Sequence, residues 1–445
     1  MPSLRVLAAA VMLLALSSRA RAEDRAPMRL SLADAVAHAS GASSVALAGL
    51  HTRESEEKAR QARAAFLPTL SGSASEVNRT LDIHTLGLEF PAIPGGPAFP
   101  TLVGPFDVVD ARLRATQTLF DYASWARLRS ARHDVSVSRA EATTTSEGAA
   151  RTSALAYLRI ARAQATVAAR QADVGLAGDL LTLAQAQLKA GTGVGIDVTR
   201  AKAQLTTASG QLTVARNQLD RAHIDLARAL GLDAWTRFEI ADTLADGMAV
   251  STAPTTPEDA AAFALERRPE LRVERERLAR ARADRLAVNA ERLPRLEAAA
   301  DYGSSGRHFS DAIATRELSV SASVPLFDGL RREARAAEQD AIAREAETRE
   351  RDLRQQVVAD VRGAELDLES GIEQERVASE QLALAEQEVA QARDRFVNGI
   401  AGNIEVINAQ VSLLRARDAE IEARFATASA RVDLARAAGV AQTLH

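Results

Sequence analysis

Several residue types and sequence features that define common protein classes are missing from this chain. It contains no cysteine among its 445 residues, which excludes disulfides, cysteine-ligated metals, a cysteine nucleophile and a lipid-modified N-terminal cysteine. Aromatic residues make up only 4%, and the apolar fraction relies on alanine, which suits closely packed long helices better than a thick core. The formal net charge of -4 gives no electrostatic reason to expect binding of nucleic acid.

Motifs for catalysis, metals and cofactors are also missing. The histidines show no metal-ligand spacing, and no phosphate-binding loop precedes a helix. The glycine-rich segment 191–195 is only superficially similar to a nucleotide-binding loop, because it joins two predicted helices rather than a strand and a helix. We therefore expect no enzyme activity, no bound cofactor and no metal site.

The first residues have the composition of a secretory signal peptide. Arg5 precedes an apolar run from Val6 to Leu16, and Ala20-Arg21-Ala22 provides a cleavage site with small residues at both ends. These features predict removal of residues 1–22 and a mature chain that starts at Glu23. The run is too short to span a bilayer as a helix, and no comparable run follows, so we do not expect membrane insertion through helices.

Residues 198–229 carry a strong periodic pattern. Large and small apolar residues alternate there at steps of three and four, at Val198, Ala201, Leu205, Ala208, Leu212, Ala215, Leu219, Ala222, Leu226 and Ala229. This spacing is typical of a coiled-coil seam. The glycines of the preceding segment Gly191–Asp197 allow a helix to reverse direction, so the stripe is interpreted as one arm of a helical hairpin. A second stripe over residues 404–435 is broken only by Asp418.

Short motifs recur in the same order in the two halves of the chain. The matched pairs are Leu67-Pro68 with Leu293-Pro294, Leu119-Phe120-Asp121 with Leu326-Phe327-Asp328, Gly191 with Gly399, and Asp197 with Glu405. They predict two copies of one module, at residues 23–240 and 257–440, joined by a linker at 241–256 and followed by a tail at 441–445. The first copy carries about 19 extra residues before its second motif. They coincide with the proline- and glycine-rich segment Phe90–Pro105, which is interpreted as a loop.

Helices are predicted before and after these motifs. Ser31 and Asp34 have the spacing of a capping box, so a helix should start there and run toward residue 66. Pro257 marks the equivalent start in the second module. Residues 122–190 contain no proline and only scattered glycine, which permits a helix of roughly 100 Å. Residues 330–397 repeat this pattern.

Each module also contains two short stretches in which apolar and polar residues alternate. The four stretches lie near residues 69–75, 112–119, 296–302 and 318–326. At roughly 8–11 residues each, they fit the strands of a transmembrane β-barrel. A soluble β-hairpin with one solvent-exposed face explains any single stretch equally well. In lipid a sheet must close on itself, and bacterial barrels start at about eight strands, so several chains would have to share one barrel.

Helix, β-hairpin, very long helix, glycine turn and returning helix, in that order and twice over, resemble the TolC family of bacterial outer-membrane factors. The resemblance is carried by the two Leu-Pro pairs, by Leu326-Phe327-Asp328-Gly329 and by the turns at residues 190–198 and 397–406, and it covers nearly the whole mature chain. It implies a mainly α chain with a membrane β part. A homotrimer would form a long antiparallel coiled-coil α-barrel and a shared twelve-stranded transmembrane β-barrel, with four strands from each chain.

The same resemblance implies a function and a set of partners. It implies an exit duct in the bacterial outer membrane that extends into the periplasm and serves a tripartite efflux pump or a type I secretion system. The duct would be a passive conduit for drugs, ions or other exported substrates. A periplasmic adaptor would hold the tunnel tip, an inner-membrane transporter would supply the energy, and outer-membrane lipid would surround the barrel. The alternative is a periplasmic coiled-coil adaptor or scaffold, which should instead have one hairpin flanked by compact β-domains.

The glycine turns hold the predicted gate. Asp197 and Glu405 stand where the family carries acidic residues near the inner end of the tunnel, and threefold symmetry would make each a ring of three carboxylates. Such rings attract cations and resist close approach, so we expect gating at the periplasmic tip. Asn408 stands at a neighbouring acidic position of the family, and Ala401 at the position of a basic latch residue. Alternatively, Asp197 and Glu405 only cap the returning helices.

Two further sets of residues are predicted to make contacts outside the chain. The turns should dock the adaptor through Gly191, Thr192, Gly193, Gly399, Ile400 and Gly402. Tyr122 and Trp125 follow the second predicted strand, where they would form an interfacial aromatic belt on the periplasmic side of the membrane. Ordinary packing is the alternative for this aromatic pair.

Overall fold

The computed structural model describes residues 27–87, 101–244 and 257–444. The predicted signal peptide and most of the predicted linker lie outside the described residues. The chain divides into two compact units, each built from both halves of the sequence. We call them the helical unit and the sheet unit. The sheet unit comprises Thr52–Val137 and Glu274–Arg349, and the helical unit comprises the rest.

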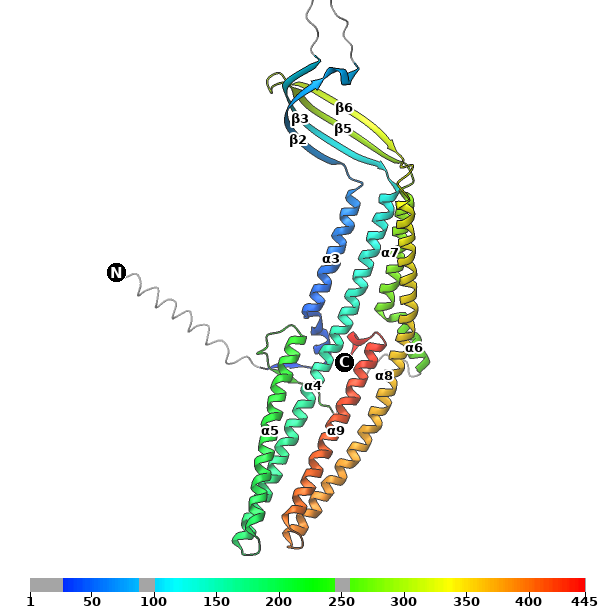
Figure 1. The fold of residues 1–445 in the computed structure, drawn as a ribbon. Helices are drawn as coiled ribbons and strands as arrows, with labels where there is room; N and C mark the ends of the chain where they lie inside the picture. The colour runs from blue at the N-terminus through cyan, green and yellow to red at the C-terminus, as the bar shows by residue number, and fades with distance from the viewer. Residues whose placement is uncertain (1–26, 88–100, 245–256, 445) are drawn as a thin grey trace, which may run out of the picture. The chain divides into compact units, whose positions relative to one another are not determined.

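Four long helices form two antiparallel hairpins (Figure 1). They are α4 (Tyr122–Lys189) and α5 (Gly195–Ala229) in the first hairpin, and α8 (Arg331–Val397) and α9 (Asn403–Ala437) in the second. The apolar seam predicted on α5 is confirmed, because its alanines Ala201, Ala208, Ala215 and Ala222 are all buried. Alanine at every seventh position therefore lets the helices approach closely, as the alternating pattern requires.

Shorter helices precede each strand pair. They are α2 (Leu32–His38), α3 (Ser43–Ala64), α6 (Pro257–Arg267) and α7 (Pro269–Ala290). The predicted capping box at Ser31 and Asp34 is confirmed. The prediction of one continuous helix toward residue 66 is wrong, because a 3-10 turn at Ala39–Gly41 and an extended Ala42 separate α2 from α3. In the second repeat Pro269 starts a new helix, since proline cannot continue the preceding one.

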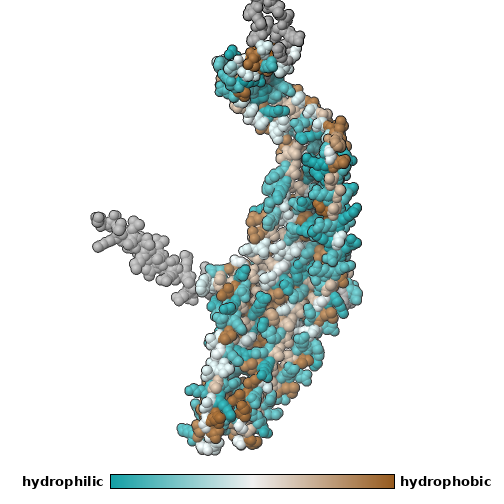
Figure 2. Space-filling view, in the orientation of Figure 1, coloured by the Kyte–Doolittle hydropathy of each residue, from teal (hydrophilic) through white to brown (hydrophobic). Residues whose placement is uncertain are grey.

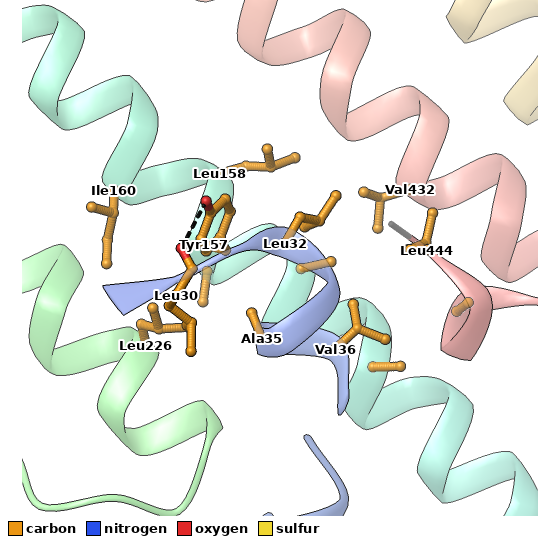
Figure 3. Close-up of a cluster of buried hydrophobic side chains, with 14 of the residues drawn as sticks. Leu30, Leu32, Ala35, Val36, Tyr157, Leu158, Ile160, Leu226, Val432 and Leu444 are labelled. Atoms are coloured by element: carbon orange, nitrogen blue, oxygen red, sulfur yellow. Dashed lines mark hydrogen bonds between the residues drawn. The ribbon is translucent and has the colours of Figure 1, made fainter. Parts of the chain in front are cut away.

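The main core of the helical unit surrounds Tyr157 on α4 (Figure 3). The strands β1 (Met28–Leu30) and β4 (Phe238–Ile240) pair in parallel beside it. The Tyr157 hydroxyl lies 3.2 Å from the Leu30 carbonyl oxygen and 2.7 Å from an Asp242 carboxylate oxygen. Burial raises the pKa of Tyr157, so the hydroxyl keeps its proton and ties the segments before α2 and after β4 to α4. The C-terminal turn η3 (Ala441–Thr443) contributes the buried Ala441 to this core.

The sheet unit holds a four-stranded antiparallel sheet. Its strands are β2 (Thr69–Asp82), β3 (Leu102–Phe120), β5 (Arg295–Gly306) and β6 (Ile313–Ser323), in the order β2-β3-β5-β6. Arg112 links three of them, because its guanidinium donates to Asp110 on β3 at 2.8 Å and to Asp301 on β5 at 2.6 Å, and lies 3.4 Å from Thr315 on β6.

Three details of the strand prediction are wrong. β6 covers Ile313–Ser323, so it starts before the predicted stretch 318–326 and ends three residues before the end of that stretch. β2 and β3 are longer than expected. They stay paired beyond the predicted end of the first stretch as far as Asp82 on β2, with a register shift between Arg79 and Leu81. The interpretation of Phe90–Pro105 as a loop fails from Leu102 onward, which belongs to β3; residues 90–100 lie outside the described residues. Among the described helices, none is long and apolar enough to cross a membrane.

Candidate functional site

The predicted docking residues and the two predicted gate carboxylates lie at the turns that close the two helical hairpins. We call residues 190–197 the first hairpin end and residues 398–405 the second hairpin end. In the first, the backbone N–H groups of Thr192 and Gly193 both donate to the carbonyl of Gln187 at 3.0 Å. Gly191 has a positive φ of 77°, and a Cβ on Gly193 would lie 2.9 Å from the Gln187 Cβ. Both glycines are therefore required by this tight helix C-cap.

The second hairpin end repeats this geometry. Gly399 has a positive φ of 67°, and the N–H of Ile400 donates to the Arg395 carbonyl at 2.8 Å. Gly402 is the N-cap of α9, as Val194 is of α5, and neither cap has a side-chain hydrogen bond. The first-turn N–H groups of both returning helices thus favour a nearby negative charge.

Asp197 and Glu405 occupy equivalent positions, the third residue of α5 and of α9. Asp197 is the more enclosed, with a side chain 14% exposed and its carboxylate 3.8 Å from the Arg200 guanidinium. Glu405 is 43% exposed and lies 2.8 Å from Arg395 at the end of α8. Asn408, one turn further along α9, is exposed.

Two side-chain amides join the hairpin ends to each other. Asn403, the first residue of α9, is fully buried and donates to the Asp197 carbonyl oxygen at 2.8 Å. Gln187 near the end of α4 donates to the Phe396 carbonyl oxygen at 3.2 Å. Behind these bonds lies an apolar cluster. Its larger buried members are Leu180, Val389, Phe396, Val406 and Leu413.

Hydrophobic side chains are also exposed at the hairpin ends, among hydrophilic ones (Figure 2). Val194 is 57% exposed and Ile196 54% at the first end, and Ile400 is 68% exposed and Ile404 48% at the second. Ile196 and Ile404 are repeat equivalents. Because exposed apolar residues gathered in this way mark interaction surfaces, the hairpin ends can each offer a small apolar contact.

The predicted aromatic pair lies in the sheet unit, directly after β3. The rings of Tyr122 and Trp125 stack with centroids 5.4 Å apart, and Trp125 is 45% exposed. The equivalent exit from β6 is more exposed still, with Leu326 at 91% and Phe327 at 80%. Exposed apolar side chains therefore lie directly after β3, at Trp125, and after β6, at Leu326 and Phe327.

Sequence reasoning did not find Arg395 or Asn403. Ala401 was noted as replacing a latch residue, yet Glu405 has a basic partner in Arg395, ten residues back along the chain. Asn403 follows a glycine turn directly, but only the folded chain brings it to the other hairpin. Among the described residues, no group of three or more His, Asp or Glu side chains could hold a metal ion.

Comparison with known proteins identifies the family. A model described as outer membrane efflux protein matches residues 39–232 and 262–440. The chain belongs to this family. Members of the family are channels rather than enzymes, so the chain is an outer-membrane channel for efflux that extends into the periplasm. The periplasmic adaptor or scaffold considered as an alternative has no support from the family match.

Solved structures of similar fold agree with this assignment. The chain is similar to CusC, with a TM-score of 0.78, 16% identity and coverage of 92% of both chains. It is similar to VceC from Vibrio cholerae, with a TM-score of 0.73, 19% identity and coverage of 92% of this chain and 96% of that one. It is also similar to the open-state MtrE channel of Neisseria gonorrhoeae, with a TM-score of 0.70, 17% identity and coverage of 92% of this chain and 89% of that one. The comparison with curated proteins gives no match.

Proposed function

We propose that three copies of this chain form one exit duct. The observation that carries the proposal is the four-stranded sheet, whose edge strands β2 and β6 have no partner strand within the described chain. A membrane cannot hold open sheet edges, because lipid offers no hydrogen-bond partner. Three chains would supply twelve strands, which is enough to close a barrel. The long hairpins would continue the barrel as a tunnel, and Tyr122 and Trp125 would form part of the belt at the periplasmic interface.

The duct works with a periplasmic adaptor and an inner-membrane transporter, in a tripartite efflux pump or a type I secretion system. The adaptor docks on the hairpin ends. Gly191, Gly193 and Gly399 shape the turns, and the exposed Ile400 and Val194 supply apolar contacts. The duct itself is passive, so it carries drugs, ions or other substrates that the transporter selects.

The hairpin ends also form the gate. Three copies would bring three Asp197 and three Glu405 carboxylates around one axis, and like charges at close range repel unless they are paired or protonated. Arg395 neutralises Glu405 within each chain, while the less exposed Asp197 is held near the second hairpin by Asn403. Within each chain, short-range hydrogen bonds therefore hold the two hairpin ends together, while residual repulsion between the carboxylates of different copies opposes closure.

The duct is tested with the full chain in its membrane. The protein should fractionate with the outer membrane, migrate as a heat-resistant trimer and conduct ions in planar bilayers. A photo-crosslinking residue at Ile400 should capture a periplasmic adaptor, whereas the same residue at the exposed Trp235, outside the hairpin ends, should not. A soluble periplasmic monomer without conductance would refute the duct, and capture only from Trp235 would refute the docking site.

A further inference from the structure

The edge strands of the sheet are built to pair with another copy of the chain. Every residue of β2 except Leu81, and every residue of β6 except Ser319, is exposed in the single chain. Neighbouring strands are antiparallel throughout the order β2-β3-β5-β6. β6 of one copy can therefore pair antiparallel with β2 of the next, which satisfies the free N–H and C=O groups of both edges.

The strand register inside the sheet follows the internal repeat without any shift. Counted from the shared Leu-Pro and Leu-Phe-Asp motifs, Thr69 and Thr116 of the first repeat correspond to Arg295 and Ser323 of the second. Thr69 pairs with Thr116, and Arg295 pairs with Ser323. The strand pairs β2–β3 and β5–β6 thus have the same register relative to their motifs. A residue pairing seen in one repeat can therefore be used to predict the pairing of the equivalent residues in the other.

We propose that β6 pairs with β2 of the next copy in the register that β3 and β5 have within one chain. The proposal rests on the homotrimer described above and specifies its strand interface. Arg114 on β3 pairs with Asp301 on β5. Their repeat equivalents are Ser321 on β6 and Ser75 on β2, which therefore lie opposite each other between copies.

Charge supports this register independently of the repeat. Asp110 pairs with Ser305, and their repeat equivalents are Glu317 and Arg79. Both equivalents are exposed in the single chain, and the register places these opposite charges face to face, an arrangement that stabilises cross-strand pairing.

Other registers lose this pairing. A slip of two residues would set Glu317 against Val77 or Leu81. A slip of one residue would turn the polar face of β6, with Ser319 and Ser321, to the apolar side of the sheet, where Leu318 and Val320 belong.

Cysteine pairs in the full chain test the register, since the natural sequence has no cysteine background. The matched pairs are Ser321→Cys with Ser75→Cys, and Ser323→Cys with Ser73→Cys. The offset controls combine Ser321→Cys with Ser73→Cys or with Val77→Cys. After oxidation in the membrane, matched pairs should give disulfide-linked dimers and trimers on a non-reducing gel, roughly fivefold more than the offset pairs, because residues directly opposite lie closer than diagonal ones.

The outcome separates the register from the trimer itself. Offset pairs that link as well as matched pairs, or no linking by any pair in a protein that migrates as a trimer, would overturn the register. A wild-type protein that forms no trimer would instead overturn the proposed function. As a second measurement, Glu317→Arg should lower the yield of heat-resistant trimer and Arg79→Glu in the same chain should restore it; failure of this rescue contradicts the charge pair.

Discussion

Single residues decide the charge at the hairpin ends. Asp197 and Glu405 are equivalent in sequence, but Arg395 approaches Glu405 at 2.8 Å whereas Arg200 stays 3.8 Å from Asp197. An exposed ion pair contributes little to stability, about 0–1 kcal/mol. Its effect on the field in a pore is larger, because it decides whether a carboxylate attracts passing cations.

We predict that the double variant Asp197→Asn, Glu405→Gln reduces cation selectivity and lowers the open probability of single channels in planar bilayers, because the repulsion that opposes closure is lost. It removes the repelling rings and leaves the Arg395 charge uncompensated. Arg395→Gln is the matched control: it frees Glu405, so cation selectivity should rise. Unchanged selectivity and open probability in the double variant would leave the two carboxylates as helix-capping residues only.

His223 is predicted to make the helical unit sensitive to acid. Its ring is buried and stacks on Phe238. Burial, with a smaller contribution from Arg237, lowers the pKa of His223 below its ordinary value of 6.5. The unfolded chain then binds the proton more readily than the folded one, so this stability is present above pH 6.5 and is lost as the pH falls below it.

The measurement is the thermal midpoint followed by circular dichroism at about pH 7 and about pH 5. The midpoint of His223→Gln should fall less than that of the wild type over this interval. His133→Gln is the control, because His133 lies in the sheet unit, where it is only partly buried beside Glu276, and the variant should retain the wild-type response. Parallel pH profiles for His223→Gln and the wild type would count against a role of His223.

At the scale of elements, ion pairs join the two helical hairpins along α4 and α9. In the described part of the chain, four pairs join α4 to α9: Arg151–Asp433, Arg162–Glu422, Arg170–Asp418 and Asp173–Arg417. Asp418 is the single break in the predicted apolar stripe, and its partner Arg170 explains why a charge stands there. Buried ion pairs add little net stability but can fix which helices pair and in which register.

The buried part of this series gives a prediction. Asp173 is 10% exposed and accepts from Arg417 at 2.7 Å and from Arg170 at 2.9 Å. Asp173→Asn removes the carboxylate that pairs with Arg417, while Arg170 keeps Asp418, so we expect a loss of about 3 kcal/mol in unfolding free energy, because a largely buried charge is left without its partner. Asp433→Asn, at the exposed end of the series, should cost less than about 1 kcal/mol. Urea unfolding of the two detergent-solubilised variants and the wild type measures both losses of unfolding free energy. Equal losses would show that the buried ion pair is no more important for stability than the exposed one.

The elements also show what sequence can and cannot predict here. The coiled-coil seam, both glycine turns and the alternation in the strands were predictable, since each depends on residues close in sequence. The pairing of α4 with α9 was not, because Arg170 and Asp418 meet only after both hairpins fold. The break at Ala39–Gly41 was missed for a related reason: it carries no proline, and core contacts of Ala39 and Ala42 hold it.

At the scale of the whole molecule, the two hairpins are matched in length. α5 and α9 each have 35 residues, and α4 and α8 have 68 and 67. The bond from Asn403 to the Asp197 carbonyl shows that the two hairpin ends lie side by side. If three copies assemble as proposed, six such ends at one level would give an adaptor a flat surface to dock on.

We therefore predict that shortening only one hairpin uncouples the channel from its pump. Deletion of residues 178–184 and 201–207 removes one heptad from each arm of the first hairpin, which preserves the seam and withdraws its end by about 10 Å. Export by cells should be lost, whereas the heat-resistant trimer and bilayer conductance should persist. Adding the equivalent deletions 386–392 and 409–415 brings both ends level again and should recover adaptor cross-linking from Ile400. Normal export with the first deletion alone would show that a level end is unnecessary for docking.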